Sequence, residues 1–463
     1  MFNHNRFLTF VVSLVLAFTV GIASGAEPEL RAGAAQERIT PPMGMPMAGY
    51  YSERLATGVH DDLFAKALYL SDGKTEIAWV VCDIIGLSRQ VVADARRRIR
   101  EQTGLATDHV LLSATHSHTG PLYSGPMPGV YEENRAKLSP MQQRYNDDLI
   151  ASITRAVVRA REQARPARLE VGIAQEPSIS FNRRFHMKNG EVRFNPGKRN
   201  PDIVRPAGPN DPRVAVLHIR DGKKDAPLAT VVNFALHLDT VGGTSFSADY
   251  PFFLGQRLRS SFGQDYVPIF AQGCCGDINH VDVSTTAPQK GFAEAERIGN
   301  RLADAAFLAL KKPRAIAEPR LGAASALVAL PLQMYSPDAI TSARKTLEKE
   351  KRLFLEEVHA HKVVKVAQIG KPALETEVQV LRIGDVAVVG LPGEVFVELG
   401  LWVREKSPFP LTIVSELAND SIGYVPTRKA CKEGSYEVVN SLIAPGGGEQ
   451  LAEKAVELLN GLK

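Results

Sequence analysis

The most informative stretch is His109-Val-Leu-Leu-Ser-Ala-Thr-His116-Ser-His118-Thr-Gly-Pro121. Its apolar run predicts a β-strand over Val110 to Ala114 that leads directly into a His-x-His turn. Side chains alternate along a strand, so His116 and His118 can point the same way. Because imidazole nitrogen is a preferred zinc ligand, the turn predicts the start of a metal site.

The same arrangement, an apolar run that ends at polar residues, recurs along the chain. Further strands are predicted at 76–83, 229–237, 267–272, 378–383, 386–391 and 411–417. Helices are predicted at 88–103, 141–165, 290–311, 337–361, 394–406 and 448–462. Apolar runs without strict alternation are typical of strands covered on both faces. The sequence therefore predicts an α/β fold, a large mixed β-sheet core flanked by helices, in a single catalytic domain with its site at the strand ends.

Three of these runs lead to further residues that can bind a metal. The run 229–237 ends at His237, Glu394 follows the run 386–391, and Tyr424 follows the run 411–417. A catalytic zinc commonly takes three protein ligands and an open position, and it lowers the pKa of water there. Glu394, predicted to open a helix, can supply an oxygen ligand. A phenol such as Tyr436 can donate a hydrogen bond to a developing oxyanion.

Residues 1–26 have the composition of a secretory signal peptide. Arg6 precedes an unbroken apolar run from Phe7 to Ile22, and small residues continue to Ala26. An uncleaved membrane anchor is the less favoured alternative, because the run is short for a bilayer span. We therefore expect export to the periplasm or the cell exterior and a mature chain of residues 27–463. No later apolar stretch in the sequence is long enough to span a membrane, and peripheral contact with a membrane surface is compatible with it.

Charge and cysteine content exclude other classes of protein. The formal net charge of the 463 residues is +4, too small to indicate a nucleic-acid partner. The four cysteines, Cys82, Cys274, Cys275 and Cys431, show neither a CxxC spacing nor a disulfide framework. The oligomeric state is left open.

The chain resembles the neutral/alkaline non-lysosomal ceramidase family over nearly its whole mature length. The most specific pieces are Ser113-Ala-Thr-His-Ser-His-Thr-Gly-Pro121 and Leu391-Pro-Gly-Glu394. The others, in order, are Arg38-Ile-Thr-Pro-Pro42, Gly58-Val-His60, Asn182-Arg183, Asn195-Pro196, Asp211-Pro-Arg-Val214, Asn233-Phe-Ala-Leu-His237, Ser247-Ala-Asp-Tyr250, Phe270-Ala-Gln272, Gly276-Asp277, Gly423-Tyr-Val-Pro-Thr427 and Tyr436.

This resemblance implies an exported hydrolase that cleaves an N-acyl amide bond, in ceramide the bond between a fatty acid and a sphingoid base. It implies Zn2+ bound by His116, His237, Glu394 and Tyr424. It also implies that His118 contacts the reacting amide, and that Tyr436 and Arg183 line the substrate site. Arg184 competes with Arg183 for that place. The chain is expected to correspond to the catalytic domain without the immunoglobulin-like C-terminal domain of typical ceramidases.

Two alternatives to the ceramidase hypothesis stay open. The chain could be a zinc hydrolase of the same scaffold that acts on another amide or ester, or a secreted binding protein with an inactive site. Other polar groups receive structural interpretations. His359 and His361 are predicted to lie on a solvated helix face. Asp249 and Asp277 are predicted to hold the site residues in place without binding the metal themselves.

Overall fold

The structure is a computed structural model that describes residues 1–2, 30–123, 138–316, 318 and 320–463. The predicted signal peptide lies outside these ranges, apart from its first two residues. Within the described ranges, no helix combines the length and the apolar character needed to cross a membrane.

The larger of the two main sheets has nine strands within the described residues and is mixed. Its neighbours run in the order β14 (Val267–Gln272), β12 (Pro227–Phe234), β11 (Arg213–Asp221), β6 (Arg165–Gln175), β1 (Arg31–Arg38), β3 (Phe64–Ser71), β4 (Glu76–Cys82) and β5 (Val110–Ala114), with β16 (Arg314–Ala315) beside β6. The pairs β12–β14 and β4–β5 are parallel, and the other pairs are antiparallel.

The second sheet has four strands and packs against the first. Its order is β17 (Leu321–Pro331), β18 (Ala373–Ile383), β19 (Val386–Gly390) and β21 (Leu411–Ser415). Trp79 of β4 and Val388 of β19 belong to the shared core between the sheets, whereas Val80 contributes to the core on the opposite face. Both faces of β4 are thus buried, which explains why its sequence is apolar without alternation.

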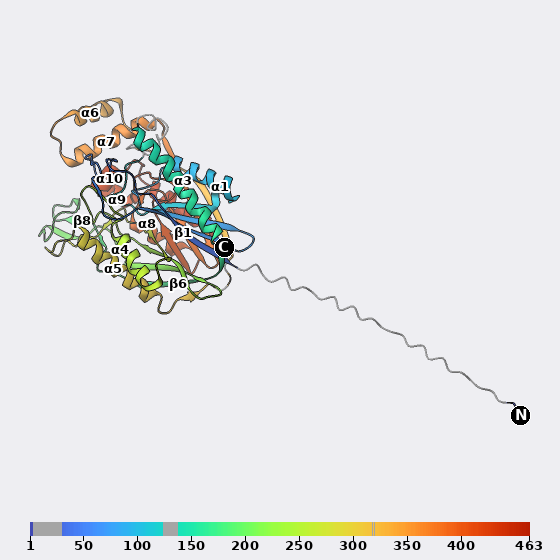
Figure 1. Cartoon of the computed structure of the whole chain (residues 1–463). Coiled ribbons are helices and arrows are strands. Elements are labelled where there is room, and N and C mark those ends of the chain that lie inside the picture. Colours follow the sequence, from blue (N-terminus) through green and yellow to red (C-terminus); the bar gives the residue numbers. More distant parts are fainter. Residues whose placement is uncertain (3–29, 124–137, 317, 319) are drawn as a thin grey trace.

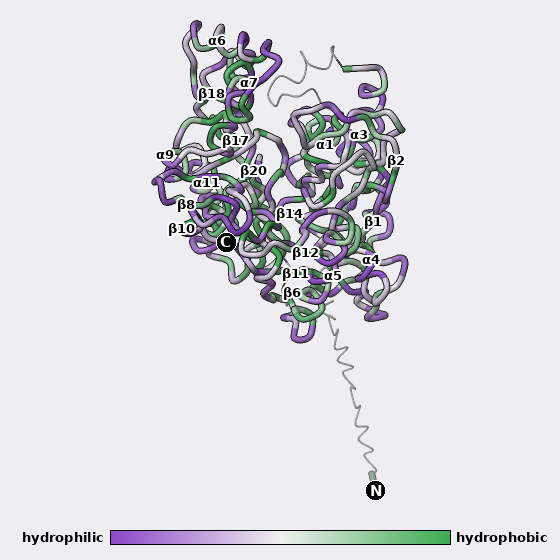
Figure 2. Tube along the Cα trace, turned by 90° about the vertical axis from the view of Figure 1, so that its left-hand side faces the viewer, coloured by the Kyte–Doolittle hydropathy of each residue, from purple (hydrophilic) through white to green (hydrophobic). Residues whose placement is uncertain are grey.

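Helices cover the outer faces of both sheets. The pair α1 (Arg89–Thr103) and α3 (Pro140–Glu162) packs on the β1–β3–β4–β5 side of the larger sheet, and α4 (Tyr250–Phe262) and α5 (Phe292–Ala309) pack on its β11–β12–β14 side. The helices α8 (Val397–Lys406) and α11 (Gly447–Gly461) cover the smaller sheet. Figure 2 shows that the green, hydrophobic parts of the trace lie inside these layers. The predicted large mixed sheet flanked by helices is confirmed.

Short elements connect these layers and shape the site. The region 181–212 contains several of them. The short elements are β2 (Gly58–Val59), the 3-10 turn Thr107–His109, β7 (Phe181–Asn182), β8 (Arg184–Met187), β9 (Val192–Phe194), β10 (Ile203–Pro206), β13 (Ser245–Phe246), β15 (Ile278–Asn279), β20 (Glu394–Val395), β22 (Tyr424–Val425), α9 (Arg428–Glu433) and α10 (Tyr436–Asn440).

Three helix predictions need correction. The predicted helix 337–361 is two helices, α6 (Pro337–Glu348) and α7 (Phe354–Ile369), which project together from the body in Figures 1 and 2. Arg352 lies in the break between them and donates to the Leu347 carbonyl at 3.0 Å, which satisfies an orphan carbonyl at the end of α6. Helix α4 was not predicted, because its aromatic residues obscure the helical period. Glu394 lies in β20 and not in a helix, since α8 begins only at Val397.

Candidate functional site

His116 is held at the end of β5 in a constrained conformation. Its backbone N–H donates to the Ile84 carbonyl at 2.9 Å, and its Nδ1 lies 2.8 Å from the Ile85 carbonyl oxygen. The backbone φ is +77°, a value that side-chain-bearing residues rarely adopt and that costs about 1–3 kcal/mol. With Nδ1 occupied, Nε2 is the nitrogen that faces the site.

The three histidines predicted from sequence meet at this point. His237 follows the end of β12, and its Nε2 lies 3.1 Å from Nε2 of His116. The Nε2 of His118 is 3.3 Å from the same nitrogen. Each ring offers a ligand atom, and these atoms all lie within 4.8 Å of one another, so the group could hold a metal ion. The Nδ1 of His237 lies 3.4 Å from the Cys275 carbonyl oxygen, an orienting contact of the kind that metal-binding imidazoles commonly make.

Glu394 and Tyr424 reach the same point through a second pair of chain segments. They are direct partners in the short parallel pairing of β20 with β22. The Oε2 atom of Glu394 lies 3.4 Å from Nε2 of His116 and 3.9 Å from Nε2 of His237. Gly393 permits this turn: its φ is +76°, and a Cβ placed there would lie 2.5 Å from the Gly423 carbonyl oxygen.

Arg183 lies behind Tyr424. Its guanidinium donates to the Tyr424 hydroxyl at 3.1 Å, to the Gly276 carbonyl at 2.8 Å and to Oε1 of Glu437 at 2.8 Å. Arg184, the competing residue, instead turns to Glu433 at 3.3 Å and to the Gly434 carbonyl. The arginine that contacts the site is therefore Arg183, and it does so through Tyr424.

Tyr436 is the first residue of α10 and lies beside Tyr424 at the same cavity. Its hydroxyl shares hydrogen bonds with the phenols of Tyr424 and Tyr51, and its ring stacks on Phe354 at a centroid distance of 5.5 Å. A cavity of about 530 Å3 opens here. His116, His118, Glu394, Tyr424 and Tyr436 line it, together with Pro46, Met47, Ala48, Gly49, Tyr50, Tyr51, Ser52, Glu53, Ile85, Gly86, Ser88, Leu122, His361, Lys362, Lys365, Ser421, Gly423 and Asn440.

The electrostatics of the site favour the neutral form of two of its imidazoles, those of His118 and His237. Burial lowers the pKa of His118 to about 4, and the neighbouring Asp239 carboxylate offsets only part of that effect. Burial, Arg183 and the other two imidazoles lower the pKa of His237 well below its usual range. Burial would raise the pKa of Glu394, but its interactions with His116, with the Arg183 guanidinium and with the Tyr424 hydroxyl lower it below its usual range. Neutral imidazoles and an ionised carboxylate are the forms that bind a metal ion.

Two buried acids hold the backbone around the site. Asp249 accepts from the N–H groups of Thr240 at 2.9 Å and Val241 at 3.0 Å, which fixes the loop after His237. Asp277 accepts from the Val397 N–H at 2.8 Å, just beyond Glu394. These contacts agree with the supporting role predicted for both acids.

Several residues of the cavity were not predicted from the sequence. Tyr50 donates to Oδ1 of Asp239 at 2.5 Å, and that oxygen lies 3.9 Å from Nδ1 of His118. His361 was assigned to a solvated face, and its side chain is 44% exposed, but it also lines the cavity and stacks on Tyr51 at a centroid distance of 5.9 Å. Lys365, one turn further along α7, also lines the cavity. A Lys/Glu-rich helix gives no sequence signal for this, since the fold of the α6–α7 pair decides which face turns inward.

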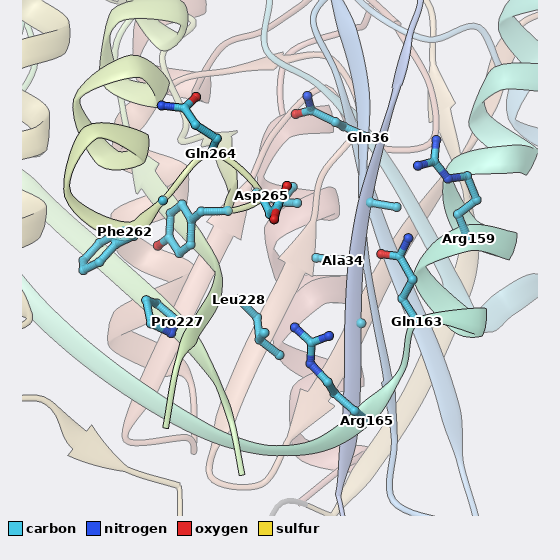
Figure 3. Close-up of a pocket in the computed structure, with 15 residues that line it drawn as sticks. Ala34, Gln36, Arg159, Gln163, Arg165, Pro227, Leu228, Phe262, Gln264 and Asp265 are labelled. Atoms are coloured by element: carbon cyan, nitrogen blue, oxygen red, sulfur yellow. The ribbon is translucent and has the colours of Figure 1, made fainter. Parts of the chain in front are cut away.

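A second cavity of about 530 Å3 lies between β1, the end of α3 and the loop after α4. Figure 3 shows Gln36, Arg159 and Arg165 on one side of it and Phe262 and Asp265 on the other. None of the residues predicted for the site line it, and none of its lining residues is a histidine, a cysteine or a glutamate.

The comparisons with known proteins concern the fold and the family resemblance. Residues 31–249 match the model of "Neutral/alkaline non-lysosomal ceramidase, N-terminal". The crystal structure of neutral ceramidase from Pseudomonas aeruginosa is similar at a TM-score of 0.76 and 19% identity, over 94% of this chain and 75% of that one. A structure described as ceramidase complexed with C2 is similar at a TM-score of 0.73 and 18% identity, over the same shares. The resemblance read from the sequence is thereby confirmed: residues 31–249 match the N-terminal model of this family, and the chain shares its fold with the two ceramidase structures.

Proposed function

We propose that the protein is an exported zinc-dependent amidohydrolase that cleaves an N-acyl amide bond of a ceramide-like lipid. The observation that carries the proposal is the convergence of His116, His237 and Glu394 on one point, with Tyr424 hydrogen-bonded to Glu394. These four side chains are the proposed metal ligands, and the family supports amide hydrolysis as the chemistry.

The donor set fits zinc. Two imidazole nitrogens and a carboxylate oxygen are ordinary zinc ligands, and a phenol oxygen completes four. The Oε2 atom of Glu394 is buried and makes no hydrogen bond within the described part of the chain. A buried carboxylate oxygen left without a partner is costly, and a bound cation removes that cost. The Nε2 atoms of His116 and His237 face each other at 3.1 Å, where two neutral rings can share at most one proton.

Bound zinc would supply a Lewis acid and lower the pKa of a water molecule. In the reaction, water oxygen adds to the carbonyl carbon, the carbon–nitrogen bond breaks, and a water proton ends on the leaving nitrogen. His118, neutral and beside the ligand cluster, is placed to carry that proton. The Tyr436 hydroxyl is placed to donate to the carbonyl oxygen as negative charge develops there. Arg183 is a positioning residue, because it holds the Tyr424 phenol.

The cavity wall suits a lipid-like substrate. The lining combines apolar side chains, among them Met47, Ile85 and Leu122, with the polar groups of the proposed ligand cluster. An acyl chain can therefore lie against these apolar side chains with its amide at the ligand cluster. Export through residues 1–26, and contact with a membrane surface, belong to the same proposal.

Hydrolysis of a fluorescent N-acylsphingosine by the purified mature protein tests this function. We expect activity that is lost on chelation and restored by zinc. His116→Ala should lose both zinc, measured by metal analysis, and activity, while far-ultraviolet circular dichroism stays unchanged. His359→Ala is the matched control, since His359 is an exposed histidine of α7 outside the cavity lining.

The outcomes separate the alternatives. Full activity in His116→Ala would refute the zinc assignment. A folded, zinc-loaded protein that cleaves other amides or esters but not N-acylsphingosine would move the substrate away from ceramide. Stoichiometric zinc without turnover of any amide or ester would favour a binding protein with an inactive site.

A further inference from the structure

Three basic residues of helix α7 border the proposed catalytic cavity. His361, Lys362 and Lys365 all line the cavity. The first two have partners: His361 lies 3.9 Å from Glu357, and the Lys362 ammonium donates to Gln333 at 3.2 Å. Lys365 differs from them, because its ammonium makes no hydrogen bond or ion pair with the described residues.

The local acids do not neutralise Lys365. Of the described residues that line the cavity, the carboxylates are Glu53 and Glu394. Glu394 faces His116 and Tyr424, and its charge reaches Lys365 only through space. Burial lowers the pKa of the Lys365 ammonium to about 8, so it is mostly charged at neutral pH. The cavity therefore has a positive charge, within electrostatic range of Glu394, that a substrate can pair with.

A purely structural lysine in this protein looks different. Lys66 is buried in the larger sheet, and its ammonium lies 3.0 Å from a carboxylate oxygen of Asp83. A partly buried ammonium that faces a substrate cavity without such a partner keeps the cost of its desolvation until an anion arrives. This contrast favours a ligand-binding role for Lys365.

On the basis of the amidohydrolase function proposed above, we infer that Lys365 binds an anionic group on the amine half of the substrate. The site would then prefer N-acyl amines with a carboxylate or sulfonate close to the amide nitrogen, such as N-acyl amino acids, over neutral N-acyl amino alcohols. The charge must lie on the amine half, because the acyl half of a fatty amide is hydrocarbon for many bonds from the carbonyl carbon. Lys365 is thus a specificity-determining residue.

A matched pair of substrates tests this inference. N-dodecanoylglycine and N-dodecanoylethanolamine have the same acyl chain and the same amide. The first ends in a carboxylate on the amine half, and the second ends in a hydroxyl group. With the zinc-loaded full chain we expect kcat/KM to favour the glycine conjugate by about 10- to 100-fold, the range of one charged hydrogen bond. Lys365→Gln should abolish that preference by lowering the value for the glycine conjugate alone, and Lys365→Arg should retain most of it. Lys345→Gln, which removes an exposed charge from α6 outside the cavity, should behave as wild type.

A binding measurement distinguishes failure of this inference from failure of the proposed function. The dodecanesulfonamides of glycine and ethanolamine resist hydrolysis, and calorimetry can compare their affinities. Tighter binding of the glycine compound that Lys365→Gln removes, without turnover of any amide, would support anion binding and refute the amidase function. Turnover of both amides at equal rates, with equal affinities for the two sulfonamides, would overturn the inference and leave the amidase function intact.

Discussion

Substitution of Glu437 by alanine should destabilise the protein and weaken its proposed metal site together. The Glu437 side chain is fully buried, with Oε1 2.8 Å from Nε of Arg183 and Oε2 3.5 Å from Nε of Arg184. At an effective dielectric constant of about 20, these distances correspond to gross attractions of about 6 and about 5 kcal/mol. Much of this offsets the desolvation of the ions, but removal of one partner leaves the other charges buried. We therefore expect Glu437→Ala to lower the free energy of unfolding by about 3–5 kcal/mol.

The assay combines guanidinium unfolding of the full chain with zinc titration. Arg183 joins Glu437 to the Tyr424 phenol through its 2.8 Å and 3.1 Å hydrogen bonds, so its release should also weaken zinc binding, by about 10- to 100-fold. Glu375→Ala is the control, because that glutamate pairs with Arg89 at 2.8 Å with both side chains about half exposed, and its loss should cost about 1 kcal/mol or less.

A double substitution separates stability from metal binding. In Arg183→Met/Glu437→Leu both charges of the closest pair are replaced by apolar groups, so stability should recover relative to Glu437→Ala. Zinc affinity should stay low, because Tyr424 has lost its arginine. A loss below about 1 kcal/mol in Glu437→Ala, or full zinc affinity in the double variant, would refute this reasoning.

Two further predictions concern acid stability and the Glu394 turn. Burial lowers the pKa of His218 to about 4; the unfolded chain therefore takes up a proton below about pH 6.5 that the folded chain does not, and stability falls as the pH drops from there toward 4. His218→Gln should lack this contribution, about 3 kcal/mol, to the loss of stability at low pH. Denaturant unfolding of the wild type and the variant at pH 7 and pH 4.5 measures how far the free energy of unfolding falls in each. An equal fall in both proteins would contradict the prediction. Gly393→Ala should lose activity and lower the free energy of unfolding by about 1–3 kcal/mol more than Gly190→Ala does. Both glycines have positive φ, but of the two only a Cβ at Gly393 would meet another backbone atom, the Gly423 carbonyl oxygen at 2.5 Å. Thermal unfolding of both variants measures the difference.

The sequence by itself determined the class of fold and the histidine pair. A strand buried on both faces is apolar throughout, and both faces of β4 are buried. Its unbroken apolar run can therefore be recognised from a single sequence. The sequence also placed His116, His237, Glu394 and Tyr424 near strand ends. Ordered motifs carried the family resemblance, which the match over residues 31–249 supports.

Only the tertiary structure decided how these residues meet. The pairing of Glu394 with Tyr424 joins two segments that are far apart in the chain, and no local pattern encodes that register. Only the structure distinguishes Arg183 from Arg184: at the junction of β7 and β8, the Arg183 guanidinium donates to the Tyr424 hydroxyl, whereas that of Arg184 donates to the Gly434 carbonyl.

Helix α7 is the clearest case of a tertiary decision. Its sequence is rich in Lys and Glu and predicts a solvated surface, and the break at residues 349–353 cannot be read from helical periodicity. Whether Lys365 faces solvent or the cavity beside His116 depends on how the α6–α7 pair folds back beside Tyr51 and Tyr436. Packing between distant segments sets that orientation, so the charge in the cavity became visible only in three dimensions.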